Sequence, residues 1–122
     1  MSVVLVWAGV MLCGGVGAVL RFTVDGEITR RAVRRLPVGT LLVNLSGAVL
    51  LGLVDGLVLD RDAALLVGTG IIGSYTTFST WMYETHRLAE ERQLPVAITN
   101  VVLSVVAGVA AAALGLWIGG GL

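Results

Sequence analysis

The sequence predicts an all-α membrane protein with four transmembrane helices, and two observations lead to this fold class. Hydrophobic residues make up 57% of the 122 residues and charged residues only 13%, with a mean hydropathy of +0.95. A soluble chain of this length cannot bury so much apolar surface. Uncharged stretches of 18 to 30 residues also recur along the chain, and about 20 residues suffice for a helix to cross about 30 Å of hydrocarbon. A water-soluble enzyme is therefore excluded.

Four helices fill the chain as a single transmembrane domain. We expect the domain to cover residues 1–122, with helices at about 3–24, 36–58, 63–84 and 94–118. Pro37 and Pro95 lie at the starts of the second and fourth helices, where a missing backbone N–H costs little. The short connections leave no room for a domain outside the membrane, so any function must lie within the bilayer.

The distribution of charge predicts the orientation. Eight arginines balance eight acidic residues, so no net charge points to a nucleic-acid partner. The arginines of the connections are Arg30, Arg31, Arg34 and Arg35 in the first, Arg61 in the second, and Arg87 and Arg92 in the third. The first and third connections together carry six arginines and the second carries one, which places the first and third connections in the cytoplasm and both termini outside. We interpret the first cluster as a topology signal, with a lipid-binding or regulatory patch as the alternative.

The third helix carries an unusual polar segment near its centre. Residues 73–80 read Gly-Ser-Tyr-Thr-Thr-Phe-Ser-Thr. Ser and Thr can return hydrogen bonds to their own backbone, but a lipid-facing helix gives no reason for so many hydroxyl groups at this depth. The segment favours a helix broken near Gly73–Thr76 at the membrane midplane. Broken backbone persists at that depth only where it is buried in protein or lines a polar cavity, and its freed carbonyl groups suit a dehydrated cation.

Polar residues also lie on the second and fourth helices. Thr40 and Asn44 are one turn apart, while Asn100, Ser104 and Gly108 are spaced by four and share one face. An amide in hydrocarbon must either bond a neighbouring helix or face a pore. The middle of each predicted helix lacks acidic residues, which argues against proton-coupled or polyvalent-cation transport. Hydroxyl and amide donors without carboxylates favour an anion pathway.

Three motifs follow one another on successive predicted helices. They are Gly14-Gly15-Val16-Gly17-Ala18-Val19-Leu20-Arg21, then Gly39-Thr40-Leu41-Leu42-Val43-Asn44 with Gly47, then Gly70-Ile71-Ile72-Gly73-Ser74-Tyr75-Thr76-Thr77-Phe78-Ser79-Thr80. Over the whole chain, this ordered set resembles the CrcB/Fluc family of fluoride channels. Three motifs in order are far more specific than any single glycine pattern.

The resemblance implies a passive fluoride channel of the plasma membrane that protects against fluoride toxicity. Its subunits form an antiparallel dimer with two fluoride pores and a central structural sodium ion. The sodium ligands fall on the backbone carbonyls of Gly73 and Thr76. Inverted subunits are related by a two-fold axis in the membrane plane, where two helix breaks can present four carbonyls to one ion. The partner is either a second copy or a related subunit of opposite orientation, and the arginine bias favours the related subunit.

The resemblance also assigns a fluoride pathway to this sequence. The expected residues are Arg21, Thr40, Asn44, Phe78, Thr80, Trp81 and Ser104. Phe78 and Trp81 match an aromatic pair whose electropositive ring edges can face a small anion. Four positions depart from the family pattern: Trp81 replaces a phenylalanine, Tyr75 an apolar aromatic, Asn100 a frequent tyrosine and Gly108 a frequent serine.

Two other functions compete with a fluoride channel. A small four-helix multidrug-type exporter needs a buried carboxylate in the first helix, and none precedes Arg21. A noncatalytic membrane assembly protein gives no reason for the hydroxyl cluster. Cys13 is the only cysteine, which excludes an intrachain disulfide and a multi-cysteine metal site. Nothing in the sequence suggests an enzyme.

Overall fold

The computed structural model of this chain describes residues 2–31 and 37–122. Arg34 and Arg35 of the basic cluster, and Leu36 at the predicted start of the second helix, lie outside the described residues. The elements are α1 (Val3–Arg31), α2 (Val38–Leu57), α3 (Arg61–Ala64), the π-helix η1 (Leu65–Ile72), α4 (Gly73–Tyr75), α5 (Ser79–Glu90) and α6 (Leu94–Gly120). All elements in the described ranges are helical. Helices α1, α2 and α6 are each long and apolar enough to cross a membrane, which indicates a multi-pass membrane protein.

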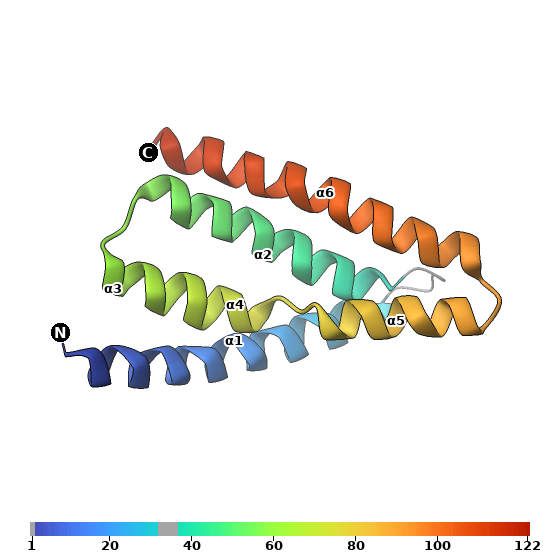
Figure 1. Ribbon diagram of the computed structural model, residues 1–122, viewed down its shortest axis with the longest axis horizontal. Coiled ribbons are helices and arrows are strands. Elements are labelled where there is room, and N and C mark those ends of the chain that lie inside the picture. Colours follow the sequence, from blue (N-terminus) through green and yellow to red (C-terminus); the bar gives the residue numbers. More distant parts are fainter. Residues whose placement is uncertain (1, 32–36) are drawn as a thin grey trace.

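The helices run up and down along one common direction (Figure 1). Both chain termini and the α2–α3 connection lie at one end of the bundle, and the α5–α6 connection lies at the other (Figure 1). Arg61 begins α3 at the end with the termini, whereas Arg87 and Arg92 belong to the opposite end. Arg30 and Arg31 close α1 at that same opposite end. The described arginines of the first and third connections therefore lie together, away from Arg61.

Glycine allows close packing between the helices. Helix α2 packs mainly against α6, and α1 packs mainly against η1 and α4. A Cβ atom at Gly52 would collide with the backbone carbonyl of Ala112, and one at Gly115 would collide with that of Val49. In lipid, such close backbone approach replaces the hydrophobic effect as a source of helix association. Many apolar side chains on the outside of the bundle are exposed, as expected for a surface that faces hydrocarbon.

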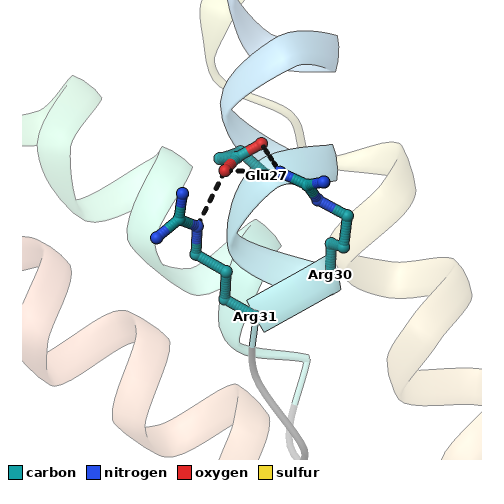
Figure 2. Close-up of polar contacts among 3 residues, drawn as sticks. All are labelled: Glu27, Arg30 and Arg31. Carbon is teal, nitrogen blue, oxygen red and sulfur yellow. Dashed lines mark hydrogen bonds and ion pairs between the residues drawn. The ribbon is translucent and has the colours of Figure 1, made fainter.

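Helix α1 continues seven residues past its predicted end at residue 24. The Glu27 carboxylate accepts hydrogen bonds from Arg30 at 2.6 Å and from Arg31 at 2.7 Å (Figure 2). Ion pairs three and four residues apart lie on one helix face and stabilise the helix between them. Residues 25–31, which the sequence analysis assigned to the first connection, are therefore helical. Helix α5 similarly continues to Glu90, beyond the predicted end at residue 84.

Candidate functional site

The site is built around three residues that separate α4 from α5. Thr76 follows α4 with an extended backbone, at φ −78° and ψ 160°, and α5 starts only at Ser79. Helix α4 is itself preceded by the π-helix η1, and π-helical turns are frequent at functional sites. The Thr76 N–H still donates to the Ile72 carbonyl at 3.0 Å, and the Phe78 carbonyl accepts from the Met82 N–H at 2.9 Å. The Thr77 N–H between them lacks a helical partner and needs another.

Helix α2 supplies that partner. The Asn44 side chain donates to the Thr77 carbonyl at 2.8 Å and accepts from the Thr77 N–H at 2.8 Å. The hydroxyl groups of Ser46 and Tyr75 are 2.9 Å apart. Gly47 lies so close to the segment that a Cβ atom would collide with the Thr76 side chain. The half-buried Asn44 amide therefore bonds the backbone of the interruption, which matches the first of the two roles expected for it, a bond to a neighbouring helix or segment.

The interruption ends with a side-chain cap. The Thr77 hydroxyl oxygen accepts a hydrogen bond from the Thr80 N–H at 3.2 Å. This is the bond by which a threonine caps a helix start, because the first N–H groups of a helix have no partner within it. Thr77 was absent from the predicted site, although threonine is among the residues preferred at the start of a helix.

A small polar pocket adjoins the capped turn. It is lined by Arg21, Asp25, Thr40, Val43, Thr77 and Thr80. Its volume of about 10 Å³ is close to the space needed by one water-sized group. The pocket brings together three predicted site residues, namely Arg21, Thr40 and Thr80. It also contains Asp25, which the sequence analysis placed in a connection and which α1 carries into the bundle.

The predicted aromatic pair is formed at the start of α5. The rings of Phe78 and Trp81 have centroids 5.6 Å apart and an interplanar angle of 78°, an edge-to-face arrangement. Phe78 is 70% exposed, so it lies at the surface of the single chain. The indole Nε1 of Trp81 is buried and has no hydrogen-bond partner in the described part of the chain.

A polar contact joins α5 to α6 beside this pair. Asn100 is 1% exposed and donates to the Thr85 hydroxyl at 2.9 Å, and Thr85 donates to the Trp81 carbonyl at 2.8 Å. The two helices run in opposite directions (Figure 1). Trp81 lies one turn before Thr85 on α5, and Ser104 lies one turn after Asn100 on α6, so both lie on the side of the Thr85–Asn100 contact that faces the same end of the bundle. The Ser104 Oγ is also buried without a partner among the described residues.

The predicted cation ligands lie at the other edge of the interruption. Gly73 is exposed and lines an open groove of about 580 Å³ beside α2 and η1. Its carbonyl is 3.5 Å from the Thr76 hydroxyl. Within residues 2–31 and 37–122, no three His, Cys, Asp or Glu side chains form a group that could hold a metal ion.

Known proteins are similar to the chain over almost its whole length. The fluoride-specific ion channel FluC 2 of Mycolicibacterium paratuberculosis is 64% identical over 115 residues, which cover 94% of each chain. FluC 2 of Mycobacterium tuberculosis is 61% identical over 115 residues, 94% of this chain and 91% of the relative. FluC 1 of Leifsonia xyli is 43% identical over 120 residues, which cover 95% of this chain and 88% of the relative. The family model described as CrcB-like protein, Camphor Resistance (CrcB), matches residues 8–116, and the chain belongs to this family.

Proposed function

We propose that the chain is a subunit of a fluoride-specific ion channel in the plasma membrane. The observation that carries this function is the 64% identity, over 94% of both chains, to a protein named for that activity. The channel lets fluoride leave the cell down its gradient and thereby protects against fluoride toxicity. Such passage involves no chemical step and needs no catalytic residue. The names of the relatives favour this function over a multidrug-type exporter or an assembly protein.

The fluoride pathway follows the polar groups around the interruption. Arg21, Asp25, Thr40 and Thr80 line the small pocket. Its guanidinium and hydroxyl groups can replace water around an anion, and the guanidinium charge offsets that of the Asp25 carboxylate. Further along, the pathway passes the aromatic pair with the Trp81 indole N–H, and it also includes the Ser104 hydroxyl. Two buried donors without protein partners are costly unless a ligand or water meets them. An anion that has lost part of its hydration shell supplies that partner.

The backbone at the interruption fits a structural sodium ion. In a continuous helix the N–H groups of Thr77 and Thr80 would bond the carbonyls of Gly73 and Thr76. Here those N–H groups bond side-chain oxygens instead. The two carbonyls are thus available as hard oxygen ligands, the kind that alkali and alkaline-earth cations prefer. When bound, sodium supplies positive charge that holds the interrupted backbone in place.

The subunit pairs antiparallel with a second subunit. In this arrangement the series from α3 to α5 forms the remaining membrane crossing, with Thr76–Phe78 near the midplane. Gly73 is exposed on the single chain, so its carbonyl can face an ion shared with the partner. The arginine bias favours a related subunit of opposite orientation as that partner, because charge distribution sets the direction of insertion.

Growth of fluoride-sensitive cells tests the proposed function. A bacterial strain without its own fluoride exporter should regain growth in fluoride when it expresses the chain together with any partner subunit that it requires. The Phe78→Ile variant should fail to restore growth, because an aliphatic side chain keeps the position apolar but removes the electropositive ring edge. Failure of the wild-type chain in membranes shown to contain it would contradict the function, and normal growth with Phe78→Ile would contradict the aromatic role.

A further inference from the structure

We infer that Asn44 and Thr77 are positioning residues for the sodium ion. Their side-chain oxygens take the two backbone N–H groups that would otherwise bond the carbonyls of Gly73 and Thr76. This inference rests on the sodium site of the proposed function and adds two residues to it. It gives Asn44 a second role, distinct from contact with an anion in the pore.

The hydrogen-bond pattern assigns this role. An α-helix joins each N–H to the carbonyl four residues earlier, so Thr77 pairs with Gly73, and Thr80 pairs with Thr76. The Thr77 N–H instead donates to the Asn44 Oδ1 at 2.8 Å, and the Thr80 N–H donates to the Thr77 Oγ1 at 3.2 Å. The carbonyls that lose their helical donors are the same two that are expected to bind sodium.

The remaining bond to the Gly73 carbonyl is weak. Its donor is the Thr76 hydroxyl at 3.5 Å, and the same hydroxyl is closer to the Ile72 carbonyl, at 3.2 Å. Hydroxyl hydrogen bonds are most often 2.7 to 2.8 Å long, so the 3.5 Å contact holds the Gly73 oxygen only weakly. Gly73 is also exposed. Its carbonyl therefore has only a weak donor among the described residues and can accept a cation as a ligand.

Asn44 is held in the orientation that this role needs. Its amide bonds both the N–H and the carbonyl of Thr77, each at 2.8 Å, and the pairing fixes which side of the amide faces the N–H. The close approach of Gly47 to Thr76 brings α2 near enough for this contact. A side chain without an acceptor at position 44 lets the Thr77 N–H return to the Gly73 carbonyl. Sodium then competes with a helical hydrogen bond.

Sodium-dependent thermal unfolding of the full chain tests the inference. A ligand that binds only the folded state stabilises it by mass action, so unfolding in sodium chloride against choline chloride reports the sodium affinity. The variants are Asn44→Leu and Thr77→Val, which remove an acceptor oxygen, and Thr77→Ser, which keeps it. Ser46→Ala is the matched control, because it removes the bond to Tyr75 beside the interruption without touching either N–H group.

The expected result is a selective loss of sodium affinity. Asn44→Leu and Thr77→Val should need about tenfold more sodium for the same stabilisation, since a hydrogen bond to the contested carbonyl must be displaced. Thr77→Ser and Ser46→Ala should respond like the wild type. If Asn44→Leu does not fold, the Thr77→Val and Thr77→Ser pair still decides. If Asn44→Leu and Thr77→Val both lower the unfolding temperature but leave the sodium response unchanged, Asn44 and Thr77 stabilise only the fold. That result would overturn the inference.

Fluoride efflux measured on the same preparations separates this inference from the channel function. A wild-type chain that responds to sodium but passes no fluoride would contradict the channel function and leave the sodium assignment standing. A wild-type chain that passes fluoride but shows no response to sodium would overturn the sodium site and this inference together.

Discussion

At the scale of single residues, Asn44 shows what a sequence pattern can and cannot predict. A buried amide requires a partner, so the sequence was sufficient to select Asn44 as a site residue. The partner is the backbone of Thr77, 33 residues away in the chain. A backbone group has no sequence signature, which is why the pattern left open whether Asn44 bonds a neighbouring helix or faces a pore.

Trp81 carries a prediction at the same scale. Trp81→Phe keeps an aromatic ring but removes the buried indole N–H, which has no partner in the described residues. Phenylalanine is the residue that the family pattern has at this position, so Trp81→Phe keeps a suitable ring edge. We expect fluoride efflux to fall by at most about tenfold, because only one hydrogen bond to the anion is lost. The change in folding stability should be small, because the lost packing of the larger ring opposes the gain from removing an unbonded polar group.

Trp117→Phe is the control, since Trp117 lies on the outer surface of α6 and is 76% exposed. Its efflux should match the wild type. Efflux from Trp81→Phe as fast as from Trp117→Phe would remove the indole N–H from the fluoride pathway.

At the scale of helices, the glycines and the charged helix ends behave differently as predictors. Small residues in apolar helices predict close packing, but which glycine meets which backbone follows from the helix rotations, which the pattern does not specify. The extension of α1 to Arg31 was missed because the first connection was judged by its charge. The spacing of Glu27 with Arg30 and Arg31 supports a helix, and that signal was present in the sequence.

Two glycines of α6 provide a matched test of helix packing. Gly115→Ala should destabilise the folded chain by about 1 to 3 kcal/mol, because its Cβ would collide with the Val49 carbonyl and force α2 and α6 apart. Gly108→Ala on the same helix meets nothing within 4 Å in the single chain and should leave stability unchanged or raise it slightly. Thermal unfolding in detergent compares them, and equal effects of the two substitutions would contradict this account of the α2–α6 contact.

At the scale of the whole molecule, the sequence was sufficient for the helical class, the multi-pass membrane character and the family. These three features depend on composition and on ordered motifs, which can be recognised in a sequence without knowing any contact between helices. The pairing of α2 with α6 and of α1 with η1 was not predictable, because apolar helix faces in lipid carry little pattern that selects a neighbour. The π-helix was also missed, since the sequence pattern did not distinguish it from an α-helix.

The arginines lead to a prediction about insertion. A single cysteine at position 59, as Leu59→Cys in a Cys13→Ala background, lies in the exposed connection between α2 and α3. Six arginines against one should send this connection to the outside in nearly every copy. We therefore expect an impermeant thiol reagent to label it from outside intact cells only. Equal labelling from both sides would favour a homodimer that inserts in both directions.

The most direct test of the central claim is fluoride efflux from liposomes that contain the purified chain, together with the related partner subunit where an active pair requires it. Efflux from the chain alone would favour a homodimer. A fluoride electrode outside the vesicles should record rapid efflux, while protein-free vesicles retain fluoride and chloride-loaded vesicles retain chloride. Retained fluoride in vesicles that hold the folded protein, or equal efflux of fluoride and chloride, would contradict the account.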